Sequence, residues 1–143
     1  MRNGIALAIA GALLTVTPAL AEEGTQSWLT PVTGSGSGRV IVSPTAQEAD
    51  GFYAQGEVEI EAAPASTTMA VTRALYSDGS CSTMSKPWTP VSPGSLTTDA
   101  DGAGSMHFVR DTPNPIGSTF YTIFRVAGGG TLLQSDCIAV YVK

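Results

Sequence analysis

The sequence predicts an all-β protein, an immunoglobulin-like antiparallel β-sandwich of about seven strands. Three observations lead to this prediction. Apolar and polar residues alternate with a period of two in successive short runs, as they do in strands with one buried face. Clusters of Gly, Pro, Asp and Ser separate these runs. No window shows the capped i, i+3, i+4 apolar stripe of an amphipathic helix.

The strand runs follow one another from residue 40 to the C-terminal end of the sequence. The clearest is 57–62, where three glutamates alternate with three apolar residues, so one face is acidic and the other apolar. The other runs lie at 40–42, 69–76, 105–108, 118–127 and 131–142. The turn clusters between them are 48–51, 63–64, 77–80, 90–94, 99–104, 112–117 and 128–130. These six runs and the turn clusters between them come close to the seven strands of an immunoglobulin-like β-sandwich.

The N-terminus has the order of a secretory signal peptide. A short start with one arginine precedes an apolar stretch, Gly4 to Leu20, and Ala19-Leu20-Ala21 is an A-x-A site followed by two glutamates. We expect cleavage after Ala21, with a retained N-terminal anchor as the alternative. The Ala-rich stretch indicates a bacterial protein, so the predicted location is the periplasm or the cell exterior.

The remaining chain divides into two parts. Residues 22–38 are predicted to be a flexible Gly/Ser-rich segment that ends in Gly-Ser-Gly-Ser-Gly, and 39–143 are predicted to be the β-sandwich domain. Trp28-Leu29 is an apolar island in the first part. It is interpreted as a short strand or staple onto the domain, with a contact to a partner as the alternative.

The charge excludes two classes of partner. Without residues 1–21 the chain holds twelve acidic and six basic residues, a balance of −6, and the basic residues are scattered. An acidic domain without a basic patch is not expected to bind nucleic acid. It also lacks the basic face that draws proteins to anionic membranes. We expect no membrane insertion after signal cleavage.

Cys81 and Cys137 are the only cysteines. Two cysteines in an exported domain most simply form one disulfide. A redox pair or a metal site is the alternative, but the spacing is not C-x-x-C and a second ligand pair is absent.

The acidic turn at Asp99-Ala100-Asp101-Gly102 begins like a calcium-binding loop. An EF-hand loop needs a bidentate glutamate at its twelfth position, and counting from Asp99 that position is Arg110. The EF-hand interpretation therefore fails. A looser calcium site at Asp99 and Asp101 stays open beside the simpler interpretation, a turn that joins two strands.

Catalytic constellations are weak. His107 is the only histidine, so one chain cannot build a histidine-based zinc or copper centre. It lies among alternating residues and is expected at the surface, opposite Met106 and Phe108. Glu57, Glu59 and Glu61 share one strand face, whereas glycoside hydrolysis needs two carboxylates that face each other across a bond. We expect no enzyme activity and no cofactor.

Aromatic residues near turns offer a binding surface. Trp88 lies between two prolines in Lys86-Pro87-Trp88-Thr89-Pro90, predicted to be a loop after Cys81. A loop tryptophan held in this way is either a rigid binding anchor or a lid over the end of the sandwich. Tyr53 and Tyr76 are the other candidates for this surface.

Two stretches resemble secreted Cu,Zn superoxide dismutases. Residues 72–82 read T-R-A-L-Y-S-D-G-S-C-S, and 128–140 read G-G-G-T-L-L-Q-S-D-C-I-A-V. In that family, a strand ending H-x-H precedes a G-x-C, and a late glycine tract precedes the strand with the partner cysteine. The resemblance implies a β-sandwich with a bridge from a loop to the last strand. The positions matching the copper-binding histidines are Ala74 and Tyr76, so the resemblance implies no metal ligand and no dismutase activity.

The sequence thus predicts an exported, non-catalytic β-sandwich that acts as a binding or structural module. Its partner is an unidentified protein or a small ligand. Two alternatives stay open: a degenerate dismutase-like, metal-dependent enzyme, and a carrier that holds a small ligand in a pocket between the sheets.

Overall fold

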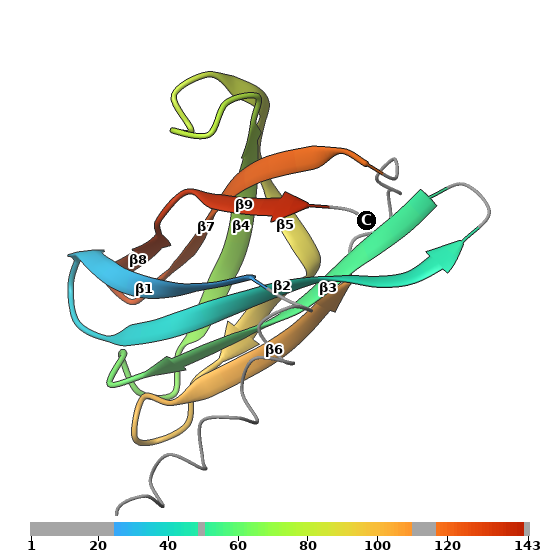
Figure 1. Ribbon diagram of the computed structural model, residues 1–143. Helices are drawn as coiled ribbons and strands as arrows, with labels where there is room; N and C mark the ends of the chain where they lie inside the picture. The colour runs from blue at the N-terminus through green and yellow to red at the C-terminus, as the bar shows by residue number, and fades with distance from the viewer. Residues whose placement is uncertain (1–24, 49–50, 110–116, 142–143) are drawn as a thin grey trace, which may run out of the picture.

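The computed structural model describes residues 25–48, 51–109 and 117–141, with the backbone alone at 44–48 and 51–54. These ranges hold nine strands and no helix, so no described helix is long and apolar enough to cross a membrane. The strands are β1 (Thr25–Thr33), β2 (Ser37–Glu48), β3 (Gly51–Glu61), β4 (Thr68–Tyr76), β5 (Met84–Thr97), β6 (Gly104–Val109), β7 (Thr119–Gly128), β8 (Thr131–Ser135) and β9 (Ile138–Tyr141) (Figure 1). The predicted signal peptide lies outside the described residues.

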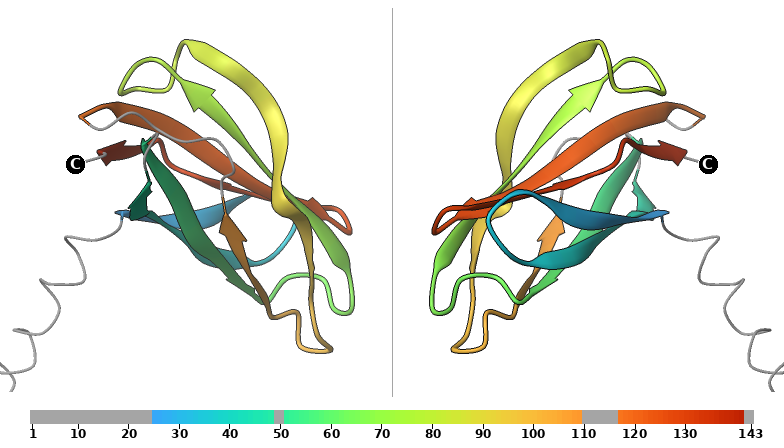
Figure 2. Two further views of the ribbon diagram at one scale, coloured as in Figure 1. Left: turned by 90° about the vertical axis from the view of Figure 1, so that its right-hand side faces the viewer. Right: turned by 90° about the vertical axis from the view of Figure 1, so that its left-hand side faces the viewer.

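The strands form one sheet in the order β4-β5-β6-β3-β2-β1-β8-β7-β9, and β4 also pairs with β7. This pairing closes the sheet into an antiparallel barrel of eight strand positions (Figure 2). The short strands β8 and β9 follow each other along β7 and together take one of those positions.

The predicted sandwich is therefore wrong, although the all-β class is right. In an open sandwich, each sheet has two edge strands with unpaired backbone groups. Here the strands that would be such edges are joined by backbone hydrogen bonds. β1 pairs with β8 from Leu29 to Thr33 on one side of the barrel, and Ser92 of β5 pairs with Val109 of β6 on the other. Barrel closure removes the edges that a sandwich would leave.

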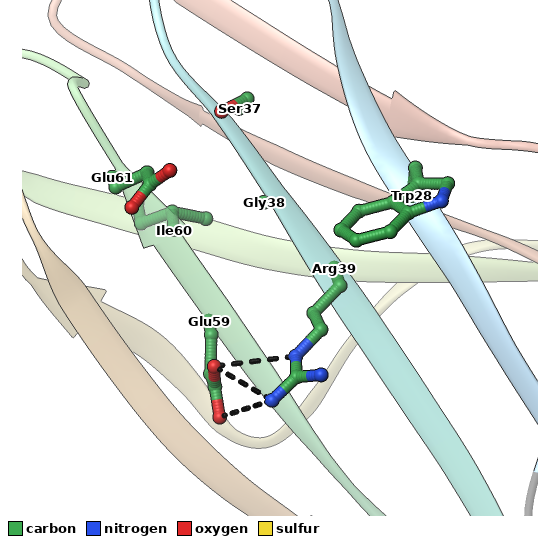
Figure 3. Close-up of a pocket in the computed structure, with 7 residues that line it drawn as sticks. All are labelled: Trp28, Ser37, Gly38, Arg39, Glu59, Ile60 and Glu61. Carbon is green, nitrogen blue, oxygen red and sulfur yellow. Dashed lines mark hydrogen bonds and ion pairs between the residues drawn. The ribbon is translucent and has the colours of Figure 1, made fainter. Parts of the chain in front are cut away.

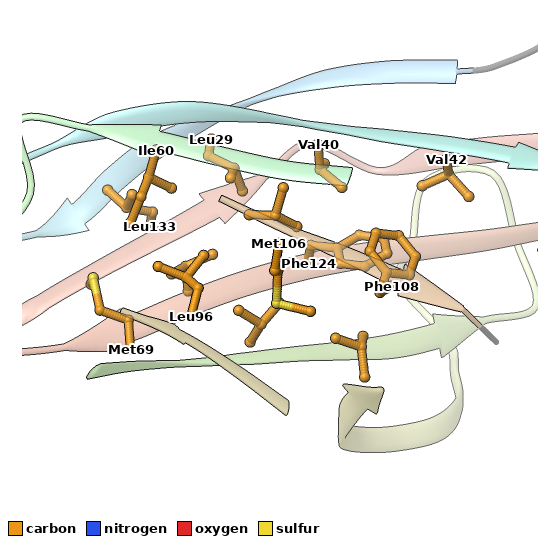
Figure 4. Close-up of a cluster of buried hydrophobic side chains, with 14 of the residues drawn as sticks. Leu29, Val40, Val42, Ile60, Met69, Leu96, Met106, Phe108, Phe124 and Leu133 are labelled. Carbon is orange, nitrogen blue, oxygen red and sulfur yellow. The ribbon is translucent and has the colours of Figure 1, made fainter. Parts of the chain in front are cut away.

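The interior of the barrel is filled by apolar side chains. Inward residues of every strand form one buried cluster, in which the rings of Phe108 and Phe124 lie 5.2 Å apart between centroids (Figure 4). Barrels of eight strands have an interior just wide enough for side chains. The cluster comprises Leu29, Val40, Val42, Val58, Ile60, Ala63, Met69, Val71, Val91, Leu96, Met106, Phe108, Phe124, Val126, Leu133, Ile138 and Val140.

A buried glycine allows this packing at one point. Gly56 lies in β3, opposite Phe108 of β6. A Cβ atom at Gly56 would lie 2.5 Å from Cζ of Phe108 and closer still to the carbonyl oxygen of Ile41. The absence of a side chain lets the phenylalanine ring cover the backbone of β3, a pairing that also occurs in designed sheets.

The N-terminal segment is part of the barrel, so its interpretation as a flexible linker is wrong for 25–38. Residues 25–33 are β1, and Gly34 to Gly36 make the tight turn into β2. Gly34 and Gly36 have φ values of 76° and 119°, which favour glycine. Thr131 fixes this turn, because its Oγ1 accepts from Ser35 N at 3.0 Å and donates to Ser35 O at 2.9 Å.

The β4–β5 hairpin extends beyond the ring (Figure 1). The predicted turn at 90–94 is a bend inside β5. The strand pairs with β4 on both sides of the bend, and Ser92 within it pairs with Val109 of β6. Trp88 lies in β5 and not in the predicted loop. Pro87 and Pro90 are tolerated there because prolines fit edge strands and bulges, where no ladder hydrogen bond is lost.

Candidate functional site

The outer face of β1, β2 and β3 carries an exposed tryptophan. Ser27 and Leu29 point inward and are buried, so the alternation of the strand turns Trp28 outward. Trp28 is 62% exposed, the largest fraction among the exposed large hydrophobic residues of the described chain. Cross-strand register places Trp28 opposite Arg39 of β2, and Arg39 opposite Glu59 of β3.

An ion pair lies beside this tryptophan. Arg39 donates from Nε to Oε1 of Glu59 at 3.3 Å and from Nη2 to Oε2 at 3.5 Å. Its Nη1 donates to Oε1 of Gln26 at 3.5 Å. The side chains of Arg39 and Glu59 are 39% and 41% exposed, so both stay accessible to a ligand.

These residues line a hollow of about 250 Å³ (Figure 3). In the figure, Trp28 lies on one side of β2 and Glu61 on the other. The ion pair of Arg39 on β2 and Glu59 on β3 lies below both residues in this view. Pockets for drug-sized ligands are usually larger, about 300–1,000 Å³. The hollow fits one side chain or a small group. Its lining is Trp28, Ser37, Gly38, Arg39, Glu59, Ile60 and Glu61.

This face has an excess of negative charge. Glu57, Glu59 and Glu61 all point outward from β3, as their alternation predicted, and Arg39 supplies one positive charge against three negative ones. Glu57 and Glu61 are exposed. His107 of β6 lies opposite Glu57 and is exposed, as predicted, with its Nε2 3.2 Å from Oε1 of Gln55.

A second hollow of about 380 Å³ lies on the other side of Glu59, toward the β5–β6 turn, where Asp99 contributes to its lining. Oδ1 of Asp99 accepts from the backbone N–H groups of Asp101 at 2.8 Å and Ala103 at 3.0 Å. These two hydrogen bonds, that from Ala103 first, lower the pKa of Asp99. The carboxylate thus stabilises the turn between β5 and β6. This agrees with the interpretation of Asp99 and Asp101 as part of a turn that joins two strands.

The calcium candidate gains no support from this geometry. Asp101 is exposed, and the described residues contain no group of three or more His, Cys, Asp or Glu side chains that could hold a metal ion.

The structure describes the side chains of two of the three residues of the predicted aromatic surface, Trp88 on β5 and Tyr76 on β4. Trp88 is half-buried and its ring is covered by Arg125 of β7, whose Cζ lies 4.0 Å from the ring centroid. Tyr76 is half-buried on β4 and lies opposite Tyr121 of β7. The side chain of Tyr53 lies outside the described residues. The structure does not bring these candidates together with Trp28.

The predicted disulfide between Cys81 and Cys137 is confirmed, with Cα atoms 5.7 Å apart. It joins the tip of the β4–β5 hairpin to the junction between β8 and β9. Cys81 has a φ of 53°, in the left-handed region that most residues avoid.

Next to Cys81, the carboxylate of Asp78 organises the hairpin tip. It accepts from the hydroxyls of Ser80 and Ser82 at 2.6 Å each and from the N–H of Thr83 at 2.7 Å. These hydrogen bonds, Ser80 first, hold the pKa of Asp78 well below its usual range.

Comparisons with protein-family models, with curated proteins and with solved structures found no match for this chain. The site therefore has to be interpreted from its own geometry. Sequence reasoning noted Trp28 but preferred a structural role for it, and it missed the hollow. The usable signal was the alternation Ser27, Trp28, Leu29, in which a large ring takes the outward position of a strand.

Proposed function

We propose that this protein is an exported, non-catalytic binding module that holds its partner on the outer face of β1, β2 and β3. The observation that carries the proposal is the 62% exposed Trp28 beside a hollow lined by charged side chains. Tryptophan and arginine are the residues on which binding energy concentrates in protein interfaces, with a few polar groups around them.

The chemistry of the hollow supports binding rather than catalysis. Glu59 is paired with Arg39, and Glu61 stands two residues away on the same strand face. Two carboxylates on one face do not face each other across a bond, as hydrolysis of a glycoside would need. The dismutase-like alternative gains no support, because Ala74 and Tyr76 occupy the positions that would need imidazoles.

The filled interior supports an external ligand over an internal one. A carrier with a pocket between sheets would need space where the cluster around Phe108 and Phe124 packs. Export is supported by the A-x-A site before Glu22 and by the Cys81–Cys137 bridge, which persists in oxidising compartments. N-terminal sequencing of the exported protein should begin at Glu22. A product that keeps Met1 would contradict cleavage.

Site-directed photocrosslinking in the exporting cell tests the proposed face. A photoreactive amino acid replaces Ser37, which is exposed and lines the hollow, or Ser95, an exposed control on β5. We expect one specific adduct from position 37, none from position 95, and loss of the adduct when Trp28→Ala is added. Equal adducts at both positions, or an adduct that survives Trp28→Ala, would contradict the proposal.

A further inference from the structure

The hollow beside Trp28 carries an excess of negative charge. Among its lining residues, Glu59 and Glu61 oppose the single positive charge of Arg39, and Glu57 adds a further carboxylate on the same face. Arg39 is engaged by Glu59 and Gln26. Glu61 is exposed and makes no ion pair within the described ranges. A ligand that brings a positive charge would complete this arrangement.

The opposite side of the barrel contains the contact that Trp28 lacks. There, the guanidinium of Arg125 lies over the ring of Trp88 at 4.0 Å, and its Nε donates to Oε1 of Gln134 at 2.7 Å. A cation over the face of an indole is attracted by the negative potential of the ring. In the described part of the chain, no cation lies over Trp28 in this way. The hollow that Trp28 lines also contains the carboxylate of Glu61, and Oε1 of Gln26 accepts from Arg39.

We infer that the hollow binds the guanidinium group of an arginine side chain presented by a partner protein, a proposal that rests on the proposed function. The planar guanidinium would stack on Trp28 and donate to the carboxylate of Glu61. Arginine fits better than lysine because it combines a flat stacking surface with paired donors that match a carboxylate. The volume of about 250 Å³ suits one side chain.

The test uses three peptides in a Gly/Ser background that differ at one central residue: arginine, lysine or citrulline. Citrulline keeps the shape of arginine without its charge. Nuclear magnetic resonance follows the indole N–H signals of the two tryptophans, so that Trp88, already covered by Arg125, serves as an internal control. Because one side chain supplies the contact, peptide concentrations reach the millimolar range.

We expect the arginine peptide to shift the Trp28 signal and leave the Trp88 signal in place. Citrulline should weaken the affinity by about tenfold, because it removes the cation–π and ion-pair contributions. Raising the salt concentration from about 0.02 M to about 0.5 M should also lower the affinity for the arginine peptide, since salt screens the attraction between exposed charges. Lysine should bind more weakly than arginine.

The variant Glu61→Gln should lower the affinity for the arginine peptide severalfold and leave the affinity for the citrulline peptide unchanged. Glu61 is exposed, so this substitution is expected to leave the fold intact. Equal affinities for arginine and citrulline, shifts confined to Trp88, or a neutral saccharide that binds at Trp28 independently of salt would overturn the inference. A specific crosslink at position 37 combined with any of these results would leave the proposed function standing.

Discussion

Removal of the disulfide should lower the stability of the barrel by a predictable amount. The bridge joins two residues 56 positions apart in the sequence and ties the β4–β5 hairpin to the β8–β9 junction. Loop-closure entropy for a loop of that length is about 14 cal/mol/K, or about 4 kcal/mol at 25 °C, and measured bridges typically give about 2–4 kcal/mol. We expect the double variant Cys81→Ala, Cys137→Ala to lose about 2–4 kcal/mol.

Urea unfolding followed by tryptophan fluorescence measures this loss. The free energy of unfolding should fall, and the dependence on urea should become steeper, because an unfolded chain without the cross-link exposes more surface. A loss below about 1 kcal/mol would show that the bridge does not restrict the unfolded chain as the entropy argument requires.

A matched variant separates the bridge from the backbone. Cys81 has a φ of 53°, which costs a residue with a Cβ about 1–2 kcal/mol and costs glycine little. The variant Cys81→Gly, Cys137→Ala should therefore be more stable than Cys81→Ala, Cys137→Ala by about 1 kcal/mol. An equal or lower stability of the glycine variant would refute the assignment of strain to this position.

Three further predictions concern individual residues. The pKa of Asp78 is lowered from 3.8, so the stability that it contributes is present above about pH 4 and is lost as the pH falls toward its folded pKa. The variant Asp78→Asn should therefore show a smaller fall of the melting temperature below about pH 4 than the wild-type protein. An equal fall in both proteins would contradict this. Gly56→Ala should cost about 1–3 kcal/mol in chemical unfolding, because its Cβ would overlap backbone and a ring, whereas Gly79→Ala, whose Cβ would lie 3.5 Å from its nearest neighbour, should cost much less. Glu59→Gln should change the unfolding free energy by less than about 1 kcal/mol, since the pair with Arg39 is about two-fifths exposed; a larger loss would show that the pair holds the fold.

Local patterns predicted most of the strands but not their closure. Alternation at 57–62 and the aromatic run at 118–127 correctly placed β3 and β7, and the glycines at 128–130 correctly marked a hairpin. Barrel closure depends on which strands meet. The pairing of β4 with β7, and of β1 with β8, joins segments far apart in sequence and leaves no periodicity to detect. The predicted class was therefore right and its architecture wrong.

The same limit applies to the candidate site. Glycine and serine at 34–38 have the composition of a linker, yet the positive φ of Gly34 and Gly36 and the hydrogen bonds of Thr131 make them a hairpin turn. With that segment set aside as flexible, Trp28 could not be placed beside Arg39 and Glu59. The disulfide was predictable because it follows from the number of cysteines and the predicted export, and it needs no knowledge of strand pairing.

The affinity of the crosslinked partner for two tryptophan variants tests the central claim most directly. The partner identified at position 37 is purified, and its binding to the wild-type protein, to Trp28→Ala and to Trp88→Ala is measured by titration calorimetry. The account predicts a loss of at least about 30-fold for Trp28→Ala, the effect of a binding hot spot of about 2 kcal/mol, and little change for Trp88→Ala. Unchanged affinity of Trp28→Ala, or a larger loss for Trp88→Ala, would contradict the assignment of the binding face to β1, β2 and β3.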